Sequence, residues 1–201
     1  MTYTIFGGVN GAGKTTLYEL FSKGEQKDFG ERINVDDITS SIGNWDDEKT
    51  QIIAARQSVK NIKKCLEKQI SFNQESTLSG RSIIQTIKKA KSLGFSIQLF
   101  YVYVDSIETA KQRVADRIQR GGHGVSGDLI EKRFTNSIIS LKEIIPLCDK
   151  ADIFYNDTNE GIIHMASVEN GAATYKSASL HGFIHDVMPT DLGDGNIASW
   201  R

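Results

Sequence analysis

The sequence Gly8-Val-Asn-Gly-Ala-Gly-Lys-Thr15 follows an apolar stretch, Thr2 to Phe6, and runs into a segment with helical periodicity, Lys14 to Phe21. These residues fit the pattern G-x-x-x-x-G-K-[ST], which requires a strand before it and a helix after it. The glycines let the backbone wrap closely around a phosphate chain, and the backbone N–H groups and the helix N-terminus supply partial positive charge. We therefore predict a phosphate-binding loop (P-loop) that holds ATP or GTP.

In such a loop the lysine adds a full positive charge at the phosphates, and the hydroxyl after it can bind Mg²⁺. We assign these roles to Lys14 and Thr15, and we expect ATP and Mg²⁺ as cofactors. The residues predicted to contact the nucleotide are Gly8, Asn10, Gly11, Ala12, Gly13, Lys14, Thr15, Thr16, Arg113 and Arg133.

Length and charge restrict the class of protein. The chain has 201 residues, a length typical of one domain, and we expect residues 1–201 to form a single one. Lys plus Arg is 24 and Asp plus Glu is 25, so no overall field attracts nucleic acid or an anionic membrane. No apolar run is long enough to span a bilayer, and two cysteines without metal-ligand spacing fit reduced thiols, so we expect a cytoplasmic protein.

Short apolar segments alternate with longer helical ones along most of the chain. This order predicts parallel βαβ units and a three-layer α/β fold with a mainly parallel sheet. Further strands are expected at Arg32–Val35, Ile70–Glu75, Phe95–Val104 and Ala151–Tyr155, and helices at Glu48–Gln69, Ser82–Leu93, Ser106–Gln119 and Asp128–Ile145. In the first of these helices the apolar residues at 52, 55, 59, 62 and 66 share one face, which we expect to be core.

The C-terminal region has a different pattern. Strand-like runs flank Asn170-Gly171, a dipeptide typical of type I′ turns, so residues 160–178 are expected to form a β-hairpin. A short helix near Leu180 to Val187 is also expected.

Two acidic residues, Asp36 and Asp37, close the second predicted strand. In a small P-loop kinase that strand end faces the acceptor, where a carboxylate can accept the proton of the attacking hydroxyl. The alternative is that one of the two acids caps a following helix.

A polar group follows the third predicted strand: Glu75, Thr77, Ser79 and Arg81. Together they suit a polyhydroxylated substrate in the crevice at the carboxyl end of the sheet. A polar loop with helix-capping hydroxyls would have the same composition. On the sequence alone Arg56, in the long helix, is a solvated residue.

Arg113, Arg117 and Arg120 project from one side of a helix that precedes Gly121-Gly-His-Gly124. We interpret residues 113–127 as a lid whose guanidinium groups close over the phosphates; the alternative is a solvated helix face. His123 is interpreted as a hydrogen-bonding loop residue.

Taken together, the motifs resemble the zeta toxin family of P-loop kinases. The stretches that carry the resemblance are Gly7–Thr16, Ile33–Ile38, Ser71–Gly80, Arg113–Val125, Glu131–Phe134 and Phe154–Thr158. Where the family tends to have Glu-Thr-Thr, this chain has Glu75-Ser76-Thr77, which keeps a hydroxyl. The chain is also shorter than the well-known toxins.

The resemblance implies a kinase that uses ATP to phosphorylate the 3′-hydroxyl of the amino sugar in UDP-N-acetylglucosamine. It implies Lys14 and Thr15 at the nucleotide and magnesium, Asp36 as the base and Glu75 as a substrate-binding carboxylate. Arg117 and Arg120 would act on the phosphates, and Arg56 falls where the family has an arginine. An antitoxin protein is the macromolecular partner that it implies.

Two rival functions remain open. One is a kinase for a small metabolite or nucleoside, and the other is a P-loop regulator that hydrolyses ATP slowly and signals by binding a partner.

Overall fold

The computed structural model describes residues 1–157 and 161–175 together with Phe183 and Val187, and these residues contain a seven-stranded sheet. The strand order is β2-β3-β1-β4-β5-β6-β7; the first five strands in that order are parallel, and the last two are antiparallel to their neighbours. The strands are β1 (Thr2–Gly7), β2 (Glu31–Ile33), β3 (Phe72–Ser76), β4 (Ser96–Tyr103), β5 (Lys150–Tyr155), β6 (Ile163–Glu169) and β7 (Ala172–Tyr175).

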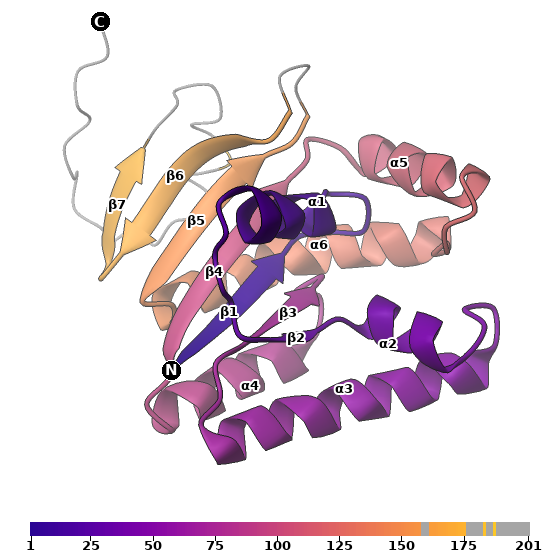
Figure 1. Ribbon diagram of the computed structural model, residues 1–201. Coiled ribbons are helices and arrows are strands. Elements are labelled where there is room, and N and C mark those ends of the chain that lie inside the picture. Colours follow the sequence, from indigo (N-terminus) through magenta and orange to yellow (C-terminus); the bar gives the residue numbers. More distant parts are fainter. Residues whose placement is uncertain (158–160, 176–182, 184–186, 188–201) are drawn as a thin grey trace, which may run out of the picture.

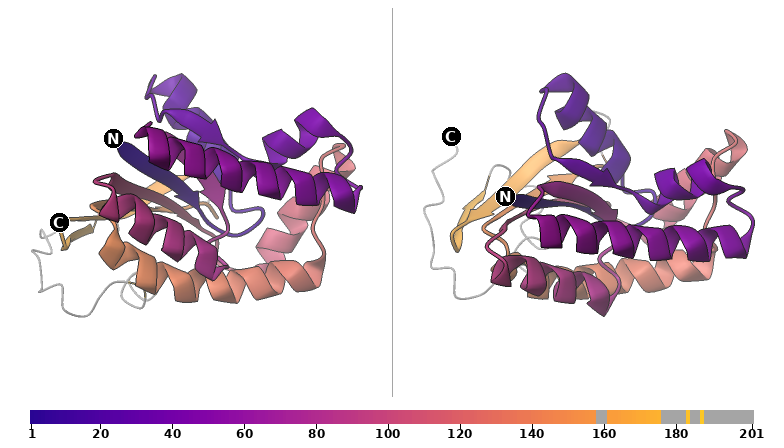
Figure 2. Two further views of the ribbon diagram at one scale, coloured as in Figure 1. Left: turned by 90° about the horizontal axis from the view of Figure 1, so that it is seen from below. Right: turned by 60° about the horizontal axis from the view of Figure 1, so that its bottom comes forward.

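Helices cover both faces of this sheet, as the alternating pattern predicted (Figures 1 and 2). On one face lie α1 (Lys14–Glu19) and its π-helical continuation (Leu20–Gly24), and on the other lie α3 (Glu48–Lys68), α4 (Arg81–Ser92) and α6 (Gly127–Ile144), followed by a 3₁₀ turn (Ile145–Leu147). The carboxyl edge of the parallel strands is flanked by α2 (Val35–Ile42) and α5 (Ile107–Gln119). No helix among the described residues combines the length and apolar character needed to cross a membrane.

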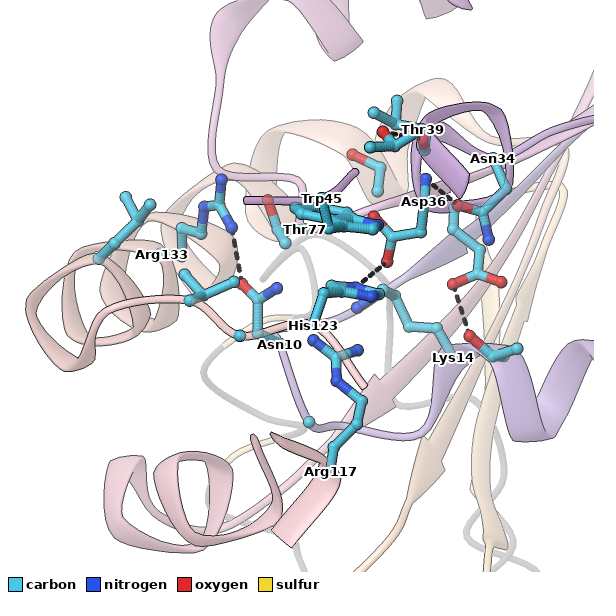
Figure 3. A pocket seen from close by; sticks show the side chains of 18 of the residues that line it. Asn10, Lys14, Asn34, Asp36, Thr39, Trp45, Thr77, Arg117, His123 and Arg133 are labelled. Carbon is cyan, nitrogen blue, oxygen red and sulfur yellow. Dashed lines mark hydrogen bonds and ion pairs between the residues drawn. The ribbon is translucent and has the colours of Figure 1, made fainter. Parts of the chain in front are cut away.

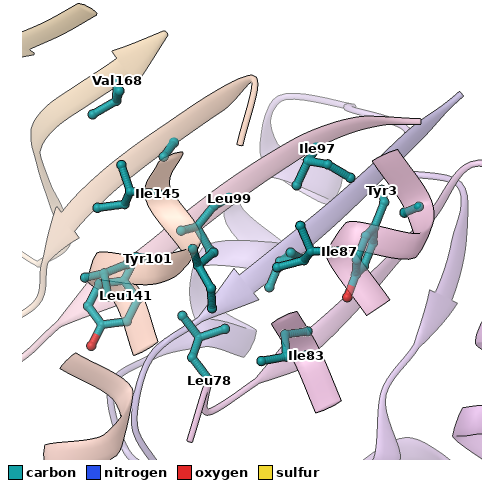
Figure 4. Close-up of a cluster of buried hydrophobic side chains, with 14 of the residues drawn as sticks. Tyr3, Leu78, Ile83, Ile87, Ile97, Leu99, Tyr101, Leu141, Ile145 and Val168 are labelled. Carbon is teal, nitrogen blue, oxygen red and sulfur yellow. The ribbon is translucent and has the colours of Figure 1, made fainter. Parts of the chain in front are cut away.

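Alternating side chains of the central strands fill two hydrophobic cores. Tyr3 of β1 and Leu99 of β4 pack with Ile87 of α4 in the larger core (Figure 4). On the opposite face Phe100 of β4 packs against Phe21 of the π-helical turn, with ring centroids 5.1 Å apart. Because both faces of β1 and β4 are covered, the loops at their carboxyl ends have a rigid base.

The predicted C-terminal hairpin is confirmed: β6 and β7 pair antiparallel, with Asn170 and Gly171 at positive φ in the turn between them. Both residues have the left-handed conformation that a type I′ turn requires. Of the predicted segment 180–187, only Phe183 and Val187 are described, so the expected short helix lies largely outside the described residues.

The second predicted strand, Arg32–Val35, is wrong at its end, because the strand stops at Ile33 and a helix, α2, begins at Val35. Asn34 is the N-cap, and its side-chain oxygen accepts a hydrogen bond of 2.8 Å from the backbone N–H of Asp36. Neither Asp36 nor Asp37 therefore caps the helix; both lie in its first turn, where the helix dipole favours negative charge.

The expected core face of α3 is also wrong over the first half of that helix. Ile52 is 44% exposed and Val59 is 65% exposed, whereas Ala54 and Leu66 are buried. The apolar spacing follows one face, but the buried positions in this half of the helix, Thr50, Ala54 and Ser58, lie on a neighbouring face that carries small residues.

This difference predicts unequal costs of truncation along α3. Val59→Ala should change the free energy of unfolding by about 0.5 kcal/mol or less, because its side chain is already in water. Leu66→Ala should cost about 2–4 kcal/mol, because it leaves a cavity in the core. Urea denaturation of both variants measures the two free energies. Equal costs would contradict the observed exposure of Val59 and burial of Leu66.

Candidate functional site

The carboxyl ends of β1 and β3 open into a cleft of about 790 Å³. The phosphate loop and α1 form its floor, α2 and α3 one wall, and α5 and α6 the other (Figures 1 and 3). Of the predicted site residues, those that line the cleft are Asn10, Gly11, Gly13, Lys14, Thr15, Thr16, Asp36, Glu75, Thr77, Arg113, Arg117 and Arg133.

The phosphate loop is fixed from two sides. Its first N–H, that of Gly8, donates to Ser76 O at the end of β3, and Asn156 Nδ2 after β5 donates to Ala12 O at 2.7 Å. Gly13 caps α1 at φ 101°, and a Cβ there would lie 2.4 Å from Asn156 Nδ2. Only glycine fits this position. Asn156, which belongs to the Phe154–Thr158 stretch of the family resemblance, positions the loop, a role that the sequence analysis did not assign to it.

Lys14 follows directly, at the N-terminus of α1. Its Nζ donates to Val9 O at 2.9 Å, so the side chain is folded along the loop and faces the cleft. Burial lowers the pKa of Lys14 to about 8; the carboxylates of Glu75 and Asp36 oppose this effect, and Arg117 and Arg133 add to it. A bound phosphate chain would favour the charged form of Lys14.

The lowered pKa of Lys14 predicts that ATP·Mg²⁺ affinity depends on pH. Below about pH 7.5 the lysine is already charged in the free protein, and affinity should not change through this group. As pH rises through 8, binding must take up a proton, so affinity should fall by up to about tenfold per pH unit. Calorimetry over about pH 6.5 to 9.5 measures this; Lys14→Arg, which stays charged, is the control. The same fall in both proteins would contradict the assignment to Lys14.

Glu75 lies at the centre of a polar network on the floor of the cleft. Its Oε2 accepts a hydrogen bond of 3.0 Å from Thr15 Oγ1, and its Oε1 accepts one of 2.5 Å from Arg32 Nη2. The guanidinium of Arg32 lies 3.6 Å from the ring centre of Tyr18, which fixes it further. Glu75 is therefore held beside the nucleotide loop by Arg32, a residue that sequence reasoning missed.

Asp36 and Asp37 point in different directions. Asp36 faces the cleft, where its carboxylate bonds to His123 Nε2 at 2.9 Å, and its second oxygen has no hydrogen bond to any described residue. Asp37 does not line the cleft; its exposed carboxylate pairs with Arg32 Nε at 3.2 Å. The geometry supports Asp36 as the candidate base.

The opposite wall presents guanidinium groups. Arg133 Nη1 donates to Asn10 Oδ1 at 2.9 Å, and Arg113 Nη2 lies 3.5 Å from Asp157 Oδ1. Arg113 Nη1 and both Nε and Nη2 of Arg117 are buried without a hydrogen-bond partner among the described residues. Buried donors of this kind are costly unless a ligand accepts from them, which indicates an anion site.

The remaining predicted residues do not line this cleft. Gly8 and Ala12 are buried within the loop itself. Ser79 is hydrogen-bonded to Thr77, with the two hydroxyl oxygens 2.8 Å apart. Three of the predicted site arginines, Arg56, Arg81 and Arg120, are exposed. Arg120 borders a second, smaller pocket, which Arg117 also lines. The structure therefore gives them no contact with a ligand in the cleft.

The donor set fits a magnesium ion. Thr15 Oγ1 and the carboxylates of Glu75 and Asp36 all line the cleft and offer hard oxygen ligands. The described residues contain no cluster of three or more His, Cys, Asp or Glu for a metal. Most ligands would come from phosphate and water, as Mg²⁺ prefers.

Comparison with known proteins connects this site to a family. The zeta toxin family model matches residues 2–167. The chain belongs to the zeta toxin family. The resemblance predicted from the motifs is thus confirmed at family level, which supports the predicted ATP-dependent kinase. An uncharacterized protein of Haemophilus influenzae is 33% identical to this chain over 127 residues. The aligned region covers 63% of this chain and 88% of that protein.

Solved structures share the fold at low identity. A chain of the AvrRxo1-ORF1:-ORF2 complex with ATP aligns with a TM-score of 0.69 and 19% identity, over 96% of this chain and 66% of that chain. The PezAT toxin–antitoxin system of Streptococcus pneumoniae aligns with a TM-score of 0.58 and 17% identity, over 100% of this chain and 80% of that chain. This zeta toxin family chain spans slightly less than two thirds of its AvrRxo1 counterpart.

Proposed function

We propose that this zeta toxin family chain is an ATP-dependent kinase that phosphorylates a hydroxyl of a UDP-amino sugar, namely the 3′-hydroxyl of UDP-N-acetylglucosamine. One observation carries the proposal: the cleft at the phosphate loop is lined both by Asp36 and by Arg113 and Arg117, whose buried guanidinium donors have no partner among the described residues. A nucleotide-binding regulator needs the phosphate loop but not a base opposite it.

Asp36 supplies the base. The acceptor oxygen attacks the γ-phosphorus, its proton passes to the free oxygen of Asp36, and the bond to the bridging β–γ oxygen breaks to release ADP. Asn34 holds the backbone of Asp36 at the start of α2, so the carboxylate is presented from a fixed element.

The cations act on the charge that moves during transfer. Lys14 from the floor and Arg117 and Arg133 from the wall approach the cleft from different elements. Because hydrogen bonds to Val9 O and Asn10 Oδ1 hold Lys14 and Arg133 before the nucleotide arrives, these two cations need little reorganisation in the transition state. Bound Mg²⁺ would neutralise the β- and γ-phosphate oxygens, with Thr15 among its ligands.

The acceptor side of the cleft offers both hydrogen-bond acceptors and a donor. Glu75 and Thr77 suit sugar hydroxyls, and Trp45 Nε1 is buried with no partner among the described residues. This mixture fits a polyhydroxylated amino sugar with an amide carbonyl. By analogy with the PezAT system, a protein antitoxin is the proposed partner.

The substrate is tested with ATP, Mg²⁺ and a panel of UDP-sugars, nucleosides and sugar acids. Product is followed by mass and by acceptor-dependent ADP release. UDP-N-acetylglucosamine should gain one phosphoryl group and exceed other acceptors by orders of magnitude, because a site built around specific hydroxyls rejects analogues that lack them. Activity on a nucleoside or sugar acid alone would contradict the UDP-sugar assignment, and no acceptor at all would favour the regulator.

Two neighbouring variants serve as matched controls. Asp36→Asn should keep ATP binding and lose about 10²- to 10⁴-fold in transfer. Asp37→Asn should lose far less, because Asp37 is exposed and outside the cleft lining. If Asp37→Asn had the larger effect, the base would be assigned wrongly.

A further inference from the structure

The loop between α5 and α6 reaches across the cleft and touches the candidate base. His123 Nε2 lies 2.9 Å from Asp36 Oδ2, although the two residues are 87 positions apart in the sequence. Gly121, with φ 85°, turns the chain at the end of α5 toward the opposite wall. Figure 3 shows the imidazole of His123 between Asp36 and the side chain of Arg117.

Trp45 fixes the plane of that imidazole. The two rings are stacked, with centroids 3.9 Å apart and planes 3° from parallel, and Trp45 comes from the segment between α2 and α3. The His123 side chain is 18% exposed, whereas that of Asp36 is 42% exposed. The partly exposed carboxylate of Asp36 is thus held by His123, and the ring of His123 is in turn held by Trp45.

We propose that His123 is a positioning residue for phosphoryl transfer, oriented by Trp45. Its Nε2–H donates to Asp36 Oδ2, which restricts rotation of the carboxylate and leaves Oδ1 to take the proton of the acceptor hydroxyl. This inference rests on the proposed kinase function. No charge on His123 is needed, because Lys14, Arg117 and Arg133 already supply positive charge near Asp36.

The contact also joins the two walls of the cleft. Asp36 and Trp45 belong to the α2–α3 wall and His123 to the loop of the α5–α6 wall. Ordering of the loop that carries His123 therefore places the base at the same time. If the base is aligned only when this loop contacts Asp36, the enzyme would transfer few phosphoryl groups to water while the loop is away from the cleft.

Two substitutions separate the hydrogen bond from the ring stack. His123→Gln keeps an N–H donor at the Nε2 position but has no aromatic ring, and His123→Phe keeps the ring but has no donor. If the hydrogen bond positions Asp36, His123→Phe should lower kcat by about 10- to 100-fold, less than loss of the base itself. His123→Gln should lose clearly less, and KM for ATP should stay unchanged in both variants.

A double-mutant cycle tests whether His123 acts through Asp36. In the Asp36→Asn background, His123→Phe should cost less than about threefold, because the group that it positions no longer acts as a base. Costs that multiply fully in the double variant would overturn the proposal. So would a ranking in which His123→Phe is the more active single variant, since that result assigns the role to the ring stack.

Fluorescence tests the contact without any turnover. The sequence has two tryptophans, Trp45 and Trp200, so Trp200→Phe leaves Trp45 as the sole reporter. The stacked imidazole shields one face of the indole from water, so His123→Ala in this background should shift the emission maximum of Trp45 to longer wavelength. Unchanged emission would overturn the proposed stack, whereas absence of wild-type turnover with every acceptor would contradict the kinase function and not the contact.

Discussion

The site depends on positive charge that the fold places around a cleft without enough anions to neutralise it. Lys14 is desolvated to the point that its pKa falls to about 8, and Arg117 has two buried N–H groups with no acceptor among the described residues. Leaving a charged donor unpaired costs more than a typical hydrogen bond returns. A bound polyanion would accept hydrogen bonds from these donors and remove that cost. We therefore interpret the cleft as the binding site for the phosphates of a nucleotide.

The strand order explains how the opposing charges reach the same place. Because β1 lies between β3 and β4, the phosphate loop after β1 has Glu75 from β3 on one side and α5, which follows β4, on the other. Parallel strands end at a common edge, so a carboxylate, a lysine and a guanidinium from distant parts of the sequence converge there. Arg32, two residues before the N-cap of α2, holds Glu75 toward Thr15.

Local chemistry could be predicted from the sequence, and contacts set by packing could not. The phosphate loop and the Asn170-Gly171 turn were found because each demands particular residues at fixed spacing. The helix α2 was missed because it is short and polar. The buried face in the first half of α3 was missed because it carries small and polar residues, whereas the apolar residues Ile52 and Val59 are exposed. Arg32 lies outside the motif stretches, and Asn156 lies within one of them but without an assigned role. The roles of both residues arise from neighbours brought together by strand pairing.

The buried guanidinium donors of the α5–α6 wall are proposed to bind the phosphate chain of the nucleotide. Calorimetric affinities for AMP, ADP and ATP at fixed Mg²⁺, measured for the wild type and for Arg117→Met, test this role. Wild-type affinity should rise with each phosphate, and Arg117→Met should remove most of the gain from ADP to ATP while leaving the affinity for AMP unchanged. Equal affinity of the wild type for AMP and ATP, or an equal loss for all three nucleotides in the variant, would contradict it.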